Sequence, residues 1–132
     1  MIIEETEEKL ISEIRKIILQ AANNSSDQWV YAGYVFSVRK GSTEMIDFFF
    51  DEKNQRGFLE DKDWFKLLRN NFKNLHKITL TEEKGCWVKC KAVLHKSGAF
   101  KVLFEYENNS RWSISPINVN QAYKILISDI LS

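Results

Sequence analysis

The sequence has few of the residues from which catalytic, cofactor and metal sites are built. Its 132 residues include two cysteines, Cys86 and Cys90, two histidines, His76 and His95, and five glycines. Neither histidine has a cysteine, aspartate or glutamate beside it at metal-ligand spacing, and no CxxC or HxxxH pair is present. Phosphate-binding loops of the GxxxxGK or GxGxxG kind are also absent. The sequence therefore predicts no metal, no cofactor and no recognisable active site.

The cysteines are poorly spaced for a disulfide or for nucleophilic catalysis. Cys86 and Cys90 lie four apart on one predicted strand, about 13 Å at ~3.3 Å per residue, whereas a disulfide needs Cα atoms within about 7 Å. Cys90 and His95 lie about 16 Å apart on opposite faces of that strand, too far for a nucleophile and its base. We expect reduced, buried thiols in a cytoplasmic protein.

Signals for membrane insertion and secretion are missing as well. The chain has no run of about 18 apolar residues that could span a bilayer. Residues 1–10, MIIEETEEKL, are acidic, whereas a secretory signal is basic and then apolar. A formal net charge of +1 provides no overall attraction to nucleic acid or to an anionic membrane. We therefore expect a cytoplasmic protein that binds neither.

What the chain does have is apolar and aromatic residues in regular patterns. With 44% hydrophobic and 13% aromatic residues, its length fits one domain, residues 1–132. The three- and four-residue spacing of apolar positions predicts helices over 3–22 and 61–76, and a last helix that begins at Asn118 or Asn120. Apolar and alternating runs predict strands over 29–39, 44–51, 86–95 and 99–107, with a short fifth strand over 111–115 before Pro116.

These elements predict an α+β fold of order αββαββα. Turns at Lys40-Gly41-Ser42 and Lys96-Ser97-Gly98 make neighbouring strands antiparallel. We therefore expect a single antiparallel sheet of four to five strands. Even-numbered positions in the strands over 86–95 and 99–107 are apolar, which predicts helices packed on that one face of the sheet.

The helix over 61–76 has two sharply different sides. Its apolar side is formed by Trp64, Phe65, Leu67, Leu68, Phe72 and Leu75. Its opposite side has a narrow basic stripe of Lys62, Lys66, Arg69, Lys73 and Lys77. Such a stripe could follow a phosphate backbone. We favour a solvated helix face, because no aromatic stacking residues lie between the basic ones.

A second candidate surface is the odd-numbered face of the sheet, which helices on the even face would leave open to solvent. It would carry Asp47, Phe49, Asp51, Trp87, Lys89, Lys91, Lys101, Leu103, Glu105 and Glu107. Aromatic anchors among mixed charges are typical of protein interfaces and of their hot spots. The alternative is that Trp87 and Phe49 pair across strands, or lie under the last helix.

The order of segments resembles a known family over residues 8–107. An N-terminal helix leads into DQWVYAGYVFSV and the strand EMIDFFFD, and a helix precedes the hairpin LHKSGAFKVLFEYEN. This pattern is similar to the YezG-like immunity (antitoxin) family of bacterial polymorphic and contact-dependent toxin systems. Members are small cytoplasmic α/β proteins. Each binds and blocks the C-terminal toxic domain, often a nuclease, of a large secreted or contact-delivered protein.

The resemblance implies a protein that is not an enzyme and that neutralises a cognate toxin domain, a nuclease, by direct occlusion in a heterodimer. Such an inhibitor needs a few aromatic anchors, and carboxylates that meet the cationic substrate cleft of the nuclease. The expected partner-binding residues are Asp47, Phe49, Asp51, Glu60, Asp61, Asp63, Trp87, Glu105 and Glu107. The alternative function is a small nucleic-acid-binding or adaptor module that uses the basic helix 62–77.

Overall fold

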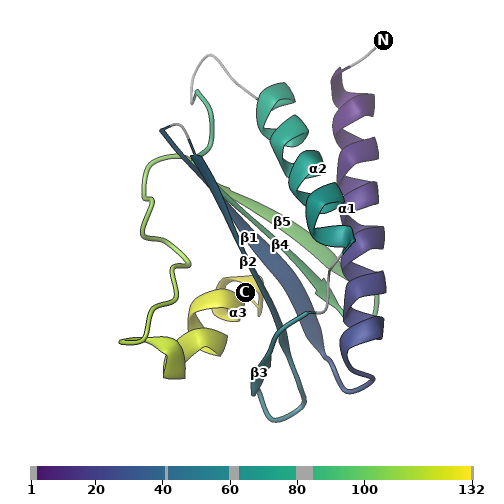
Figure 1. Cartoon of the computed structure of the whole chain (residues 1–132), viewed down its shortest axis with the longest axis vertical. Helices are drawn as coiled ribbons and strands as arrows, with labels where there is room; N and C mark the ends of the chain where they lie inside the picture. The colour runs from purple at the N-terminus through teal and green to yellow at the C-terminus, as the bar shows by residue number, and fades with distance from the viewer. Residues whose placement is uncertain (1–2, 41, 60–62, 80–84, 132) are drawn as a thin grey trace.

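A single antiparallel sheet forms the centre of the fold (Figure 1). The computed structural model describes residues 3–40, 42–59, 63–79 and 85–131. The helices are α1 (Ile3–Ser25), α2 (Trp64–Ile78) and α3 (Ala122–Leu131), and the short 3-10 helix η1 (Val119–Gln121) precedes α3. The strands are β1 (Tyr31–Arg39), β2 (Ser42–Phe50), β3 (Arg56–Gly57), β4 (Lys89–His95) and β5 (Phe100–Glu105). They form a five-stranded sheet of order β3-β2-β1-β4-β5, which confirms the predicted α+β class.

The predicted strand over residues 111–115 is wrong, and the fifth strand comes from another part of the chain. Trp112 has a φ of 63°, a left-handed conformation that interrupts any strand. β3 forms instead because Asp51 closes a turn after β2. The Asp51 Oδ1 accepts hydrogen bonds from the N–H groups of Lys53 (2.9 Å) and Gln55 (3.0 Å). The chain then returns antiparallel to the end of β2.

α1 and α2 cover one face of the sheet, which we call the helix-pair face (Figure 1). The buried residues recur at the predicted spacing: Ile14, Ile17, Ile18 and Ala21 of α1, and Leu68, Phe72 and Leu75 of α2. Phe72 stacks on Phe36 of β1, with 5.3 Å between the ring centroids. Leu67, predicted on the apolar side, is 48% exposed. One residue before the buried Leu68, it points about 100° away from the core.

α3 covers the opposite face, so the prediction that all helices pack on one face is wrong. Leu126 and Ile127 of α3 are buried in one cluster with Val35 of β1, Phe48 of β2 and Val93 of β4. The reason is that β1 and β4 are buried along most of their length, on both faces. Both faces therefore need a covering layer. Figure 1 shows α3 on one side of the sheet and the two longer helices on the other; we call its side the α3 face.

The two hairpins have turns of different length, and this decides which side chains share a face. In the β4–β5 hairpin the His95 N–H donates to the Ala99 carbonyl (2.8 Å), so three residues form the turn, as predicted. In the β1–β2 hairpin Arg39 pairs with Ser42, which leaves two residues between them where the prediction has three. A register change of one residue turns every side chain of a strand to the other face. The odd-numbered side chains of β2 therefore lie on the helix-pair face.

Candidate functional site

The odd-numbered side chains of β4, predicted on an open surface, lie beneath α3 and the segment before it. Lys91 is fully buried, and its Nζ donates to the Leu126 carbonyl (2.7 Å) and forms an ion pair with Asp129. Lys89 is 3% exposed, and its Nζ donates to the Arg111 carbonyl (2.8 Å). Because both lysines bind the C-terminal part of the chain itself, this face is not open to a partner, and the prediction of an exposed sheet face is wrong.

Trp112 lies at the centre of this internal network, which we call the Trp112 cage: Lys91, Arg111, Trp112 and Asp129. Two cations lie over its ring, the Lys91 Nζ at 4.7 Å and the Arg111 guanidinium at 4.5 Å from the centroid. The indole N–H donates to the Asp129 Oδ2 (2.9 Å). A left-handed φ costs a non-glycine residue on the order of 1–3 kcal/mol. The cage holds Trp112 in that conformation and attaches α3 to the sheet.

Glu105 and Glu107, the acidic residues predicted to bind a partner at the end of β5, have different surroundings. The Glu105 carboxylate accepts hydrogen bonds from Arg111 Nη1 (2.8 Å) and from the N–H groups of Glu107 and Asn108 (3.1 Å each). These bonds, the Arg111 guanidinium first among them, lower the pKa of Glu105 to about 2. Its side chain is 16% exposed. Glu105 therefore binds its own chain, and Glu107 is the exposed member of the pair.

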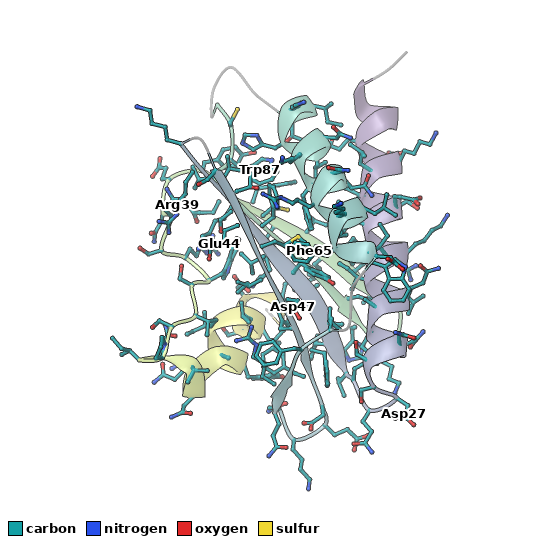
Figure 2. All side chains as sticks on the ribbon, viewed as in Figure 1. Asp27, Arg39, Glu44, Asp47, Phe65 and Trp87 are labelled. Carbon is teal, nitrogen blue, oxygen red and sulfur yellow. The ribbon has the colours of Figure 1, made fainter. Side chains whose placement is uncertain are left out.

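The prediction that Trp87 is an exposed anchor is wrong, because Trp87 is fully buried on the helix-pair face. Its ring meets Phe36 and His76 edge-on, with centroids 6.1 and 4.6 Å away. Its indole N–H donates to the Thr79 Oγ1 (2.7 Å). β4 begins only at Lys89 and residue 88 forms a bend, so the alternation of faces does not extend back to Trp87. Figure 2 shows Trp87 on the side of α2, and Arg39 and Glu44 on the other side of the sheet.

Asp47 and Phe49 instead lie at the β2–β3 edge of the sheet, on the helix-pair face. The Asp47 Oδ2 accepts a hydrogen bond from the Leu59 N–H (2.7 Å), and the Asp47 carbonyl accepts one from Arg56 Nη2 (2.9 Å). The Phe49 ring lies against Gly57, where an added Cβ would approach the ring to 2.2 Å. Phe49 is therefore a packing residue that fills the space over β3, and Asp47 is held in place by backbone and side-chain donors.

The same edge carries an exposed aromatic residue that the sequence pattern did not single out. Phe58 is 67% exposed, and the Arg56 guanidinium lies 4.7 Å from its ring centroid. Burial lowers the pKa of Arg56, and the nearby Asp47 carboxylate opposes that shift. We define the β3 edge surface as Asp47, Asp51, Arg56 and Phe58. In the sequence Phe58 is a single phenylalanine after a polar loop. It belongs to no periodic apolar pattern, so an interpretation based on periodicity does not detect it.

The predicted acidic residues at the start of α2 are described only in part. Asp63 occupies the N-cap position and is exposed, and its side chain makes no capping hydrogen bond. Glu60 and Asp61 lie outside the described residues. A partner that binds the Asp63 carboxylate would therefore not break a capping hydrogen bond.

The basic stripe of α2 is interrupted in the middle. Arg69 is half-buried, and its Nε and Nη2 both donate to the Thr43 Oγ1 of β2 (3.1 and 2.7 Å). The exposed members of the stripe are Lys66, Lys73 and Lys77, and Lys62 lies outside the described residues. Because Arg69 is bound to the sheet, the stripe does not present a continuous row of free cations, which favours the solvated-face interpretation.

The histidines and cysteines are dispersed. His76 Nε2 donates to the Trp87 carbonyl (2.9 Å), and His95 lies at the end of β4. Cys90 is fully buried, which raises the pKa of its thiol, but Cys86 is exposed, so the expectation that both thiols are buried is wrong for Cys86. The described ranges contain no group of three or more His, Cys, Asp or Glu side chains that could hold a metal ion.

One cavity lies between the β4–β5 hairpin and the end of α3. It has a volume of about 220 Å³ and is lined by Tyr31, Val93, His95, Ala99, Lys101 and Ile130. The His95 Nδ1 accepts a hydrogen bond from the Ser97 N–H (3.1 Å), and the Lys101 Nζ donates to the Ile130 carbonyl (2.9 Å). These lining residues include no carboxylate and no thiol. The His95 ring and the Lys101 ammonium group are each hydrogen-bonded to a backbone group. The lining therefore has no nucleophile with a base beside it.

Comparison with known proteins identifies no relative. No protein-family model matches the chain, and no curated protein matches it. None of the helices in the described parts of the chain is both long and apolar enough to cross a membrane. The strongest candidate site is the β3 edge surface, where the Arg56 guanidinium lies over the exposed Phe58 ring, the Asp47 carboxylate is near Arg56, and Asp51 closes the turn before β3.

Proposed function

We propose that this chain is a bacterial immunity protein that binds a cognate toxin domain in the cytoplasm, as a heterodimer, and blocks it. The observation that carries the proposal is Phe58, which is 67% exposed at the edge of the sheet with the Arg56 guanidinium over its ring. Aromatic residues and arginine supply much of the binding energy at interface hot spots. An inhibitor that acts by occlusion needs such an anchor and no reacting groups.

The carboxylates on β2 and in the segments on either side of β3 support a nuclease as the target. Asp47 and Asp51 are half-buried within the β3 edge surface, and Glu52 and Asp63 are exposed. A nuclease binds its polyanionic substrate in a cationic cleft, which carboxylates on a rigid edge complement. The Leu59 N–H fixes the Asp47 carboxylate at 2.7 Å, so little side-chain freedom is lost when a partner binds.

The test is growth rescue and direct binding. This chain is co-expressed with the C-terminal domain of a large secreted protein encoded beside its gene, and the purified pair is titrated. We expect the chain to restore growth and to co-purify with that domain. Phe58→Ala should weaken binding about thirtyfold or more, the fold-change of a hot-spot residue.

Ile117→Ala is the matched control, because Ile117 is also apolar and is 97% exposed, in the segment before η1. It should leave affinity and growth rescue unchanged. If the unmodified chain neither rescues growth nor co-purifies with the domain, the immunity function is wrong. If it does both, and Phe58→Ala binds as tightly as Ile117→Ala, the function stands and the β3 edge surface is the wrong site.

A further inference from the structure

The two edges of the sheet are protected to different degrees. At one edge the two-residue β3 pairs with Phe49 and Phe50 at the end of β2, whereas β5 forms the other edge with six residues. Short strands, prolines, bulges and exposed lysines are the usual devices against pairing with another chain, and β5 has only the last of these, Lys101. β5 has the sequence FKVLFE, which contains no proline, and it pairs with β4 in an unbroken register from Phe100 to Glu105. In the described residues β5 is therefore an edge strand that is open to a further strand along its whole length.

The backbone groups that β5 offers can be identified from the ladder. The His95 N–H donates to the Ala99 carbonyl, so the odd-numbered residues of β5 direct their N–H and C=O groups toward β4. In an antiparallel ladder these directions alternate along the strand. The groups of Phe100, Val102 and Phe104 therefore point away from the sheet. In the described residues no hydrogen bond to these groups is recorded from outside β5.

We propose that β5 pairs antiparallel with β5 of a second copy of this chain, about a two-fold axis at Leu103, so that the two sheets become continuous. The outward-pointing residues are even-numbered, so they must pair with even-numbered residues of the second copy. Val102 opposite Phe104 of the second copy satisfies this requirement. A shift of one residue would set outward-pointing groups against inward-pointing ones and remove the hydrogen bonds.

The side chains of β5 are complementary in this register. Lys101 lies opposite Glu105 of the second copy, and Leu103 lies opposite Leu103 of the second copy. All of these side chains are on the α3 face. Val102 lies opposite Phe104 on the helix-pair face. Opposite charges, aromatic pairs and pairs of an aromatic with a β-branched residue are the cross-strand pairs that stabilise sheets. A register shifted by two residues breaks both Lys101–Glu105 pairs. One such shift places Lys101 opposite Leu103, and the other places Glu105 opposite Leu103 and Lys101 opposite Glu107, which lies beyond the end of β5.

The charged members of these pairs can take part without losing their internal bonds. Lys101 is exposed, and its Nζ uses one hydrogen for the Ile130 carbonyl (2.9 Å), which leaves two further donors. A carboxylate has about four acceptor sites, and Glu105 uses three of them for Arg111, Glu107 and Asn108. On the helix-pair face Phe100, Val102 and Phe104 are packed against the core beneath α1 and are only partly buried, so part of each side chain can still meet a second strand.

The decisive test combines oligomeric state with amide exchange on the unmodified full-length chain. Sedimentation equilibrium over a wide concentration range should show a monomer–dimer equilibrium. In the dimer the amide hydrogens of Val102 and Phe104 should exchange slowly, and on dilution to monomer they should exchange fast. A chain that stays monomeric throughout would overturn the proposal. So would a dimer in which these two amides exchange freely.

A charge reversal provides the matched comparison. Lys101→Glu sets two glutamates opposite each other at both symmetry-related positions and should raise the dimer dissociation constant about tenfold or more. Lys124→Glu makes the same charge change at an exposed position of α3 and should leave it unchanged. If Lys101→Glu and Lys124→Glu change the dimer dissociation constant equally, the proposed register of the two β5 strands is wrong. If Lys101→Glu does not fold, the exchange of Val102 and Phe104 in the unmodified chain still decides.

The dimer does not depend on the proposed toxin binding, because Phe58 follows β3 at the opposite edge of the sheet. Phe58→Ala should therefore leave the dimer dissociation constant unchanged. If β5 amides of a monomeric chain become protected only when the toxin domain is added, the partner of β5 is the toxin and the dimer proposal is wrong.

Discussion

Lys91 is the residue that ties the last helix to the sheet. It is fully buried, and its ammonium group is neutralised by Asp129 and bound to the Leu126 carbonyl (2.7 Å). Burial lowers the pKa of Lys91, and the hydrogen bond that Lys91 donates to Asp129 opposes that shift. A buried pair of this kind contributes little over an apolar pair of the same shape, but the loss of one partner leaves a charge uncompensated. The two residues are therefore not equivalent when they are replaced.

Asp129→Ala should lower the free energy of unfolding by about 3 kcal/mol, because it leaves the buried Lys91 ammonium without its counter-ion. Lys91→Met has nearly the same shape and removes the charge itself, so it should cost about 1 kcal/mol or less. Urea unfolding with unchanged m-values measures both. A cost for Lys91→Met as large as that for Asp129→Ala would show that the ion pair itself is a net source of stability.

At the scale of elements, α2 contributes side chains to the core and also binds β2 near the edge of the sheet. Leu68, Phe72 and Leu75 are buried, and Arg69 on its flank donates two hydrogen bonds to Thr43 at the start of β2. The exposed lysines lie on the side away from the core, as expected of an amphipathic helix. Their charge keeps the outer face of α2 solvated and needs no ligand to explain it.

On the proposed immunity function, the triple variant Lys66→Glu, Lys73→Glu, Lys77→Glu should bind and block the cognate toxin domain as tightly as the unmodified chain. Neither protein should bind single-stranded RNA or duplex DNA at low salt beyond the level of a neutral control protein. The alternative function predicts the opposite, namely binding that weakens with salt and that the triple variant abolishes. Far-ultraviolet circular dichroism confirms that the variant is folded.

At the scale of the whole molecule, Glu105 connects the end of β5 to α3 through Arg111. It ends β5 and binds Arg111, and Arg111 in turn reaches Asp129 of α3 (3.2 Å). The chain of ion pairs thus runs from the open edge of the sheet to the helix that covers the α3 face. Its strength depends on Glu105 and Asp129 being ionised, which makes stability sensitive to acid.

The free energy of unfolding should fall as the pH is lowered from about 4.5 toward about 2. The pKa of Glu105 is lowered in the folded chain from 4.5 to about 2, so its carboxylate stabilises the fold above pH 4.5. That contribution is lost as the pH falls through this range, because the unfolded chain takes up the proton first. Glu105→Gln should flatten this part of the profile, and the exposed Glu107→Gln should not. Urea unfolding at a series of pH values makes the comparison.

Local patterns in the sequence determined most of the elements. The helix predicted over 3–22 is α1, and the one over 61–76 is α2, each within a few residues of its observed ends. The turn Lys96-Ser97-Gly98 joins β4 to β5, and Gly98 adopts the positive φ of 104° that a tight turn of this kind uses. These features depend on residues a few positions apart, so periodicity and turn chemistry suffice to find them.

Only the tertiary structure decided which way the side chains face. One residue fewer in the β1–β2 turn moved Asp47 and Phe49 to the helix-pair face, and a bend before β4 buried Trp87. α3 covers the second face because Leu126 and Ile127 bury the apolar side chains there, and Lys91 is paired with Asp129, a residue far along the chain. Register and coverage depend on hydrogen bonds and packing between distant segments, about which a local pattern carries no information. Whether a catalytic motif is present can be read from residues close together in the sequence. The exposure of Phe58 and the open edge of β5, by contrast, arise only when the sheet has assembled.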